Sequence, residues 1–323
     1  MSVLQTDIDK YTNDILCDFL NSKKFKLKKN KTKEITILSK PQANNIKLDK
    51  EDINNIKQKS LGNELFRFRK KLYKHFTSND LNLLNNNIKT LKVKIKYIAP
   101  EILLLKFAGG KYKMRKNKIE LIKYFKDKCT NHEFFHMATS FYDEKLNIGF
   151  SGFQQILFYK KESIGYGLNE GYTDLLAKRY FNEKVENRSY SYDVCRFFSK
   201  KLEEIVGQKE METFYLTADL FGLYNYLINF DEGMNVATFI VTLDYILSHA
   251  SIFNPKGCEN RFALIECYLS KWYIKKTEQE LNNGTIDENT FNKNINTYIE
   301  SLENEELYIK NYIKENSQKK RIL

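Results

Sequence analysis

Two histidines and a glutamate form a short motif in the first half of the chain. His132, Glu133 and His136 stand in the sequence HEFFH, with the histidines four residues apart. On an α-helix this spacing places both imidazoles on one face, where they can bind one metal ion beside the intervening glutamate. The chain has only four histidines, so two of them at this spacing rarely arise by chance. The motif therefore predicts a metal site with Glu133 as its general base. A surface helix with two incidental histidines is the alternative.

A second motif follows in the segment 167–174, which reads GLNEGYTD. Together the two motifs resemble the gluzincins, the zinc metallopeptidases whose third metal ligand is a glutamate on a later helix. Thermolysin-like members carry NExxSD there, and this chain has Asn169, Glu170, Thr173 and Asp174, with threonine in place of serine. The zinc aminopeptidases carry LNEG, which this chain also has. The resemblance implies Zn²⁺ as the cofactor and Glu170 as its third ligand. It also implies that Asp174 accepts a hydrogen bond from a ligand histidine.

The resemblance further implies a reaction. Two imidazoles and one carboxylate leave a fourth position open, as in catalytic zinc sites. We therefore expect hydrolysis of a peptide bond by a metal-activated water, with Glu133 as general base. The aminopeptidase motif GxMEN is replaced by AGGKY at residues 108–112, which favours an endopeptidase over an exopeptidase. The residue that stabilises the oxyanion stays unassigned among five candidates: Tyr159, Tyr166, Tyr172, Tyr224 and His249.

Composition and periodicity predict an α+β fold that is mostly helical. The chain of 323 residues is 42% hydrophobic, with 21 Tyr and 23 Phe but only 3 Pro and 13 Gly. Such a chain buries a sizeable core. The resemblance implies a small antiparallel sheet that leads into the active-site helix and is followed by an all-helical lobe. We predict three segments: an N-terminal helical segment with a basic arm (1–90), a catalytic lobe (91–181) and a helical C-terminal lobe with a tail (182–323).

Hydrophobic periodicity places the individual elements. Alternation of apolar residues with lysines over Leu91–Tyr97 predicts a half-buried strand. The segment before the metal motif predicts a hairpin. The resemblance implies that its edge binds an extended substrate by strand addition, and an ordinary hairpin without a ligand is the alternative. The longer spacer 144–165 predicts an inserted hairpin. The other expected elements are mainly helices. They are expected at 1–20, 50–88 (with a stop and a new start at Ser78–Asp80), 127–141 (the metal helix), 169–181, 192–206, 210–229, 234–250 and 259–281, with two further helices beginning at Thr285 and Ser301 and a strand at Leu103–Phe107.

Positive charge is concentrated near the N-terminus. The formal net charge is +12, and residues 21–50 hold ten lysines against Glu34 and Asp49. This stretch is either a solvated basic arm or an electrostatic patch for an anionic partner such as nucleic acid, an anionic membrane or an acidic protein. Two further functions therefore stay open beside the endopeptidase. They are a nucleic-acid-associated or regulator-cleaving protease, and a non-catalytic, metal-stabilised interaction module.

Cysteine usage and the N-terminal sequence predict a cytoplasmic protein. The five cysteines are odd in number and form no CxxC pair, which favours free thiols over a disulfide framework. The N-terminal residues lack the basic and apolar regions of a secretory signal. No uninterrupted apolar stretch is long enough for a transmembrane segment. The oligomeric state stays open.

Overall fold

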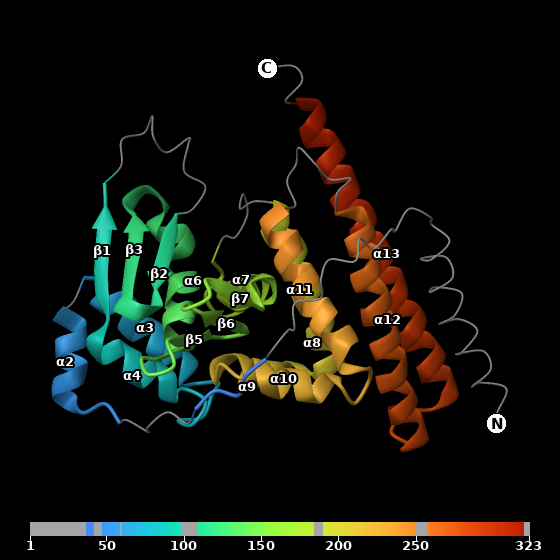
Figure 1. Ribbon diagram of the computed structural model, residues 1–323, viewed down its shortest axis with the longest axis horizontal. Coiled ribbons are helices and arrows are strands. Elements are labelled where there is room, and N and C mark those ends of the chain that lie inside the picture. The colour runs from blue at the N-terminus through green and yellow to red at the C-terminus, as the bar shows by residue number, and fades with distance from the viewer. Residues whose placement is uncertain are drawn as a thin grey trace.

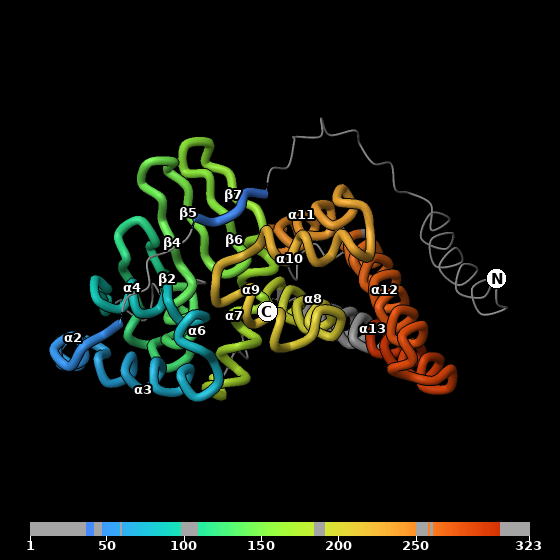
Figure 2. The backbone as a smooth tube through the Cα atoms, turned by 90° about the horizontal axis from the view of Figure 1, so that it is seen from below, coloured from blue at the N-terminus to red at the C-terminus, as the bar shows by residue number. Residues whose placement is uncertain are grey.

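The structure is a computed structural model that describes residues 37–41, 47–58, 60–97, 109–183, 190–249 and 258–319. Figures 1 and 2 show two small sheets among helices at one end of the molecule and long helices at the other. The described elements confirm the predicted mostly helical α+β fold. The helix predicted at 1–20 and the strand predicted at Leu103–Phe107 lie outside the described residues, as does most of the basic arm 21–50.

The first sheet has three strands in the order β1-β3-β2. Strand β1 (Lys92–Lys96) pairs in parallel with β3 (Lys118–Ile122), and β2 (Gly110–Lys113) pairs antiparallel with β3. The strand and the hairpin predicted from the sequence are both confirmed, but the sheet expected to be antiparallel is mixed, because β1 runs parallel to β3. The hairpin turn contains a 3₁₀ turn (Met114–Lys116), and a second one, Lys123–Phe125, joins β3 to the following helix.

That following helix, α6 (Lys126–Ala138), carries the HEFFH motif. It lies close to the predicted 127–141, but Ser140 and Phe141 belong to the next strand. Its buried aromatic pair packs on Phe68, whose ring centroid lies 5.3 Å from that of Phe134 and 5.0 Å from that of Phe135. The predicted helical region 50–88 is three helices, because turns interrupt it: α2 (Lys50–Gln58), α3 (Gly62–Leu72) and α4 (Asn82–Thr90).

The spacer between the two motifs forms a second sheet rather than one hairpin. Its four antiparallel strands lie in the order β4-β5-β6-β7. The inserted hairpin predicted for 144–165 is present as β5 and β6, but the sheet extends beyond it on both sides. The strands are β4 (Ser140–Asp143), β5 (Ile148–Ser151), β6 (Gln154–Leu157) and β7 (Glu162–Ile164).

The rest of the described chain is helical: α7 (Tyr166–Phe181), α8 (Tyr190–Val206), α9 (Gln208–Leu216), α10 (Leu220–Leu227), α11 (Gly233–His249), α12 (Glu259–Asn282) and α13 (Glu288–Lys319). Two predictions need correction. The single helix predicted at 210–229 is broken, because Ala218 adopts a left-handed φ of 56°. The helix start predicted at Ser301 is wrong, because the chain continues through it as α13.

A buried aspartate joins the helical part of the chain to helix α7. Gly165 precedes this helix with a φ of 80°, a conformation that favours glycine, so no capping side chain is available there. Asp244 on α11 replaces it: its carboxylate accepts hydrogen bonds from the amides of Gly165 (2.8 Å) and Gly167 (2.7 Å). Two otherwise unpaired amides of the helix N-terminus are thereby satisfied.

One continuous hydrophobic core extends across the three predicted segments. It contains residues from α2 through α13, among them Leu65, Phe134, Leu202 and Trp272, each fully buried. The division into segments stays a prediction. Within the described part of the chain, no helix has both the length and the apolar character needed to cross a membrane.

Candidate metal centre

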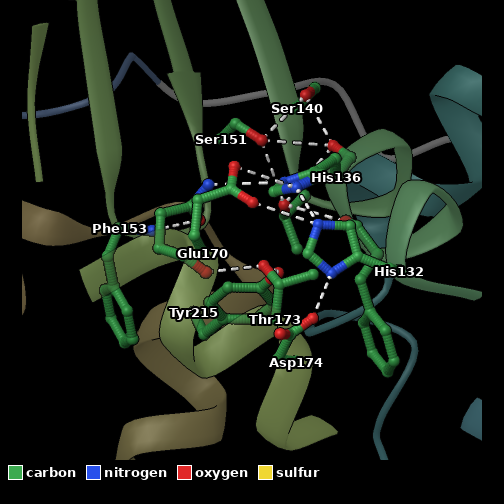
Figure 3. A network of polar contacts seen from close by, with 12 residues as sticks. His132, His136, Ser140, Ser151, Phe153, Glu170, Thr173, Asp174 and Tyr215 are labelled. Atoms are coloured by element: carbon green, nitrogen blue, oxygen red, sulfur yellow. Dashed lines mark hydrogen bonds and ion pairs between the residues drawn. The ribbon is translucent and has the colours of Figure 1, made fainter. Parts of the chain in front are cut away.

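Helices α6 and α7 bring the three predicted metal ligands together in the interior (Figure 3). The Nε2 atoms of His132 and His136 lie 2.9 Å apart. The carboxylate of Glu170 reaches both rings, at 3.1 Å from His132 Nε2 and 3.3 Å from His136 Nε2. All three side chains are buried, and their ligating atoms lie within 4.8 Å of one another. The structure therefore contains a His132-His136-Glu170 cluster that is compatible with a metal site.

Asp174 fixes the orientation of the first histidine. Its Oδ1 lies 2.7 Å from Nδ1 of His132, one helical turn after Glu170 on α7. A carboxylate at this distance accepts the Nδ1 proton, which leaves the Nε2 lone pair facing the cluster. Arg196 of α8 lies on the other side of the same carboxylate, with Nη1 4.0 Å from Asp174 Oδ2. The predicted contact between Asp174 and a ligand histidine is thus present.

Asn169 and Thr173 pack beside the cluster from the same helix. The Asn169 side chain accepts a hydrogen bond from the amide of Phe153 at 3.1 Å, and its Nδ2 lies 3.3 Å from Nδ1 of His136. The hydroxyl of Thr173 donates to the carbonyl of Asn169 at 2.6 Å and contacts the hydroxyl of Tyr215 at 2.6 Å. The residues of the second motif therefore form one connected network around the two histidines (Figure 3).

The donor set suits a cation. Burial raises the pKa of the Glu170 carboxyl, but His136 and His132 beside it outweigh burial and hold the pKa below its usual range. Two imidazole nitrogens and an ionised carboxylate converge on one point. Their lone pairs and the negative charge repel one another unless a proton or a cation lies between them. Mixed nitrogen and oxygen donors of this kind are typical zinc ligands.

Glu133 lies next to this cluster but is not part of it. Its side chain is only 5% exposed, and it faces Gly110 at the start of β2. A Cβ atom at position 110 would lie 2.8 Å from both Cγ and Oε1 of Glu133, so glycine lets the strand approach the carboxylate. Among the described strands, β2 pairs with β3 alone. The unpaired edge of the sheet thus runs past the predicted general base.

Of the five oxyanion candidates, Tyr166 is the one whose pKa responds to the charges of both Glu170 and Glu133. The negative charge of Glu170 raises the pKa of Tyr166, with burial and Glu133 adding to the rise, and Tyr192 hydrogen-bonds its hydroxyl. The other candidates have different surroundings. Tyr172 donates to Glu203 at 2.6 Å, Tyr159 is 56% exposed, and the ring of His249 stacks on Tyr245 at 4.0 Å. The hydroxyl of Tyr224 lies against Gly233.

Three contributors near the site were not predicted from the sequence. Glu183, just after α7, accepts hydrogen bonds from the amides of Asn131 (2.8 Å) and His132 (3.4 Å). Arg196 and Tyr192 reach the site from α8, four residues apart and so on one face of that helix. Spacing could have shown that these two act together, but nothing local to them indicated that their helix faces the metal motif.

Comparison of the chain with protein-family models, with curated proteins and with solved structures finds no match.

Proposed function

We propose that the protein is a zinc-dependent peptidase of the gluzincin type that acts as an endopeptidase. The observation that carries the proposal is the convergence of His132, His136 and Glu170 on one point, with Glu133 buried beside them. A purely structural metal site needs no such additional carboxylate. The three ligands leave a fourth position open, which is the form of catalytic zinc sites.

Each of the other residues then has a defined task. Zinc at such a site supplies Lewis acidity, which acidifies water and polarises a peptide carbonyl. Glu133 accepts the proton of the attacking water and returns it to the leaving amine. Tyr166 donates a hydrogen bond to the oxyanion that develops on the scissile carbonyl. Asp174 holds His132 in the tautomer that presents Nε2 to the metal.

The open edge of β2 supports a peptide as the substrate. An extended chain can add to such an edge through main-chain hydrogen bonds. Because Gly110 at the start of β2 faces Glu133, a peptide bound there would pass the general base. The exposed backbone of an edge strand does not require a free substrate terminus, which agrees with endopeptidase action.

Metal analysis combined with a peptide-library screen tests the proposal. We expect the purified protein to contain about one zinc per chain and to cleave internal bonds of extended peptides in the library. A chelator should stop cleavage, and added zinc should restore it. A protein that binds zinc but cleaves nothing across the library would instead be a metal-stabilised interaction module. A protein that binds no zinc would overturn the proposal.

Changing Asp174 to asparagine should weaken metal binding without abolishing it. The amide keeps the size of the side chain but loses the charge that fixes His132, so zinc affinity should fall by roughly 10- to 100-fold. Competition with a chromogenic chelator measures this change. Asp127→Asn is a matched control, because Asp127 is exposed in the first turn of α6, the helix that carries His132. Equal zinc affinity in both variants would show that Asp174 does not support the ligand.

A further inference from the structure

One face of the β1-β3-β2 sheet is strongly basic. Alternation along β1 places its lysines on the face opposite to Val93 and Ile95. The strand register places the charged residues of β3 and β2 on the same face, since Lys94 and Lys111 both lie opposite Glu120. We call this surface the lysine face. Its charged residues are Lys92, Lys94, Lys96, Lys111, Lys113, Lys118 and the single acid Glu120, and the buried Ile122, which pairs with Lys96, lies on the same face.

Glu120 holds half of these lysines in place at the centre of the face. Its carboxylate lies 2.6 Å from Nζ of Lys96 and 2.9 Å from Nζ of both Lys113 and Lys118. One carboxylate cannot neutralise three ammonium groups, so the cluster stays positive. It also fixes the positions of three cations before any ligand arrives, which lowers the entropic cost of binding.

The remaining three lysines are free to bind a partner. Lys92, Lys94 and Lys111 are exposed, and no described carboxylate lies within salt-bridge distance of them. A cavity of about 790 Å³ opens at the amino end of β1 and β3, with Lys92 and Lys118 in its wall and Arg115 and Lys116 of the hairpin turn beside them. The positive surface therefore continues beyond the strands.

Two exposed tyrosines stand at the opposite end of the same sheet. Tyr97 follows β1 and is 78% exposed, and Tyr124 follows β3 and is 77% exposed. Because β1 and β3 are parallel, both residues lie at the carboxyl end of the sheet, and Tyr97, which follows Lys96, alternates to the side opposite to the lysines of β1. Nζ of Lys123 lies 4.7 Å from the ring centre of Tyr97. Neither ring is buried in the core, so both offer flat apolar surfaces to a ligand.

We propose that the lysine face binds the phosphates of single-stranded nucleic acid, whose flexible strand passes over the carboxyl end of the sheet and stacks its bases on Tyr97 and Tyr124. Non-specific single-strand binding combines a positive track for phosphates with aromatic rings on which unpaired bases stack, and this sheet has both. A duplex keeps its bases stacked on one another and so has no use for the tyrosines. An anionic membrane is bound through large apolar side chains such as Trp, Phe and Leu that enter the headgroup boundary, and the exposed large hydrophobic side chains described at this sheet are tyrosines alone. The other large exposed hydrophobic residues of the described chain, such as Leu146 and Met234, lie on other elements.

Fluorescence anisotropy with a labelled oligothymidylate tests this proposal on the full chain. The triple variant Lys92→Gln, Lys94→Gln, Lys111→Gln should bind at least about 10-fold more weakly at low salt. The slope of log affinity against log salt concentration should become less negative by about 2 for this variant, because each lost phosphate contact removes roughly 0.7 from the slope. The variant Tyr97→Ala, Tyr124→Ala should weaken binding by about 5- to 100-fold for each base that loses its stacking partner. All the substituted residues are partly or fully exposed, so zinc content and circular dichroism should match the wild type.

Matched controls separate a specific surface from net charge. Lys200→Gln, Lys209→Gln, Lys293→Gln removes the same charge from exposed positions on α8, α9 and α13, and it should leave oligonucleotide binding nearly unchanged. Tyr159→Ala is the corresponding control for the tyrosines. Equal weakening by the control lysine variant would overturn the proposal, as would an unchanged affinity in the tyrosine variant. Binding to phosphatidylserine vesicles without binding to the oligonucleotide would assign the face to a membrane instead.

Discussion

Replacing Glu133 with glutamine should leave zinc at about one per chain and lower the rate of peptide hydrolysis by about 100- to 10,000-fold. Glu133 is buried beside the His132-His136-Glu170 cluster but does not belong to it. Glutamine keeps the size and polarity of the side chain, so the fold and the metal should be retained. The proton-accepting carboxylate is lost, and with it the general base. Steady-state kinetics on a peptide found in the library screen, with elemental analysis of the same sample, measures both effects.

Glu170→Gln is the informative comparison for this variant. Glu170 contacts both histidines, so its replacement should lower zinc content and activity together, and added zinc should restore part of both. Glu133→Gln should not respond to added zinc. If Glu133→Gln cleaves at the wild-type rate, another group or a contaminating protease accounts for the activity. If it loses zinc, Glu133 is a ligand and the assignment of the base is wrong.

Replacing Tyr166 with phenylalanine should lower kcat by about 100- to 1,000-fold and change KM little. The substitution removes one hydroxyl from a ring that lies within the electrostatic reach of Glu170 and Glu133. A donor to the oxyanion acts in the transition state and contributes little to ground-state binding, which is why kcat should carry the loss. The measurement is the dependence of initial rate on substrate concentration for a single peptide.

Tyr159→Phe controls for the loss of a tyrosine hydroxyl as such. Tyr159 lies between β6 and β7 and is 56% exposed, so its hydroxyl should not affect either constant. A Tyr166→Phe variant with a raised KM and an unchanged kcat would show that Tyr166 binds substrate without assisting the reaction. Loss of zinc from this variant would assign it a structural task in the metal centre.

The residues of the candidate metal site could be predicted because the patterns that indicate them lie within short stretches of sequence. His132 and His136 lie on one helix, and Glu170 and Asp174 lie on another, so helical spacing alone fixes how each pair projects. That the two helices meet was implied by the resemblance to the gluzincins and not by the spacing. The alternation of Val93 and Ile95 with lysines likewise indicated a strand with one buried face.

The contributors that were missed depend on contacts between distant segments. Asp244 lies 77 residues from Gly167 in sequence, and Glu183 lies 51 residues from His132. Neither residue lies in a periodic pattern that indicates which residue it contacts. The break at Ala218 was also invisible, because its left-handed backbone is imposed by packing on a residue that ordinarily favours helix. The basic face emerged only from the strand register, which pairs lysines of three strands that are separate in sequence.

The aspartate that caps α7 makes the stability of the fold around the candidate metal centre depend on pH. Burial raises the pKa of Asp244 to about 7, against the hydrogen bonds from the backbone amides that lower it. In an unfolded chain this carboxyl would titrate near about 4. Between these two values the folded protein binds the proton more tightly than the unfolded chain does, so folding takes up a proton. The free energy of unfolding therefore decreases as pH rises through this window, and the group adds no further change above it. The fold is thus most stable when this aspartate is uncharged, although the amides of Gly165 and Gly167 favour its charged form.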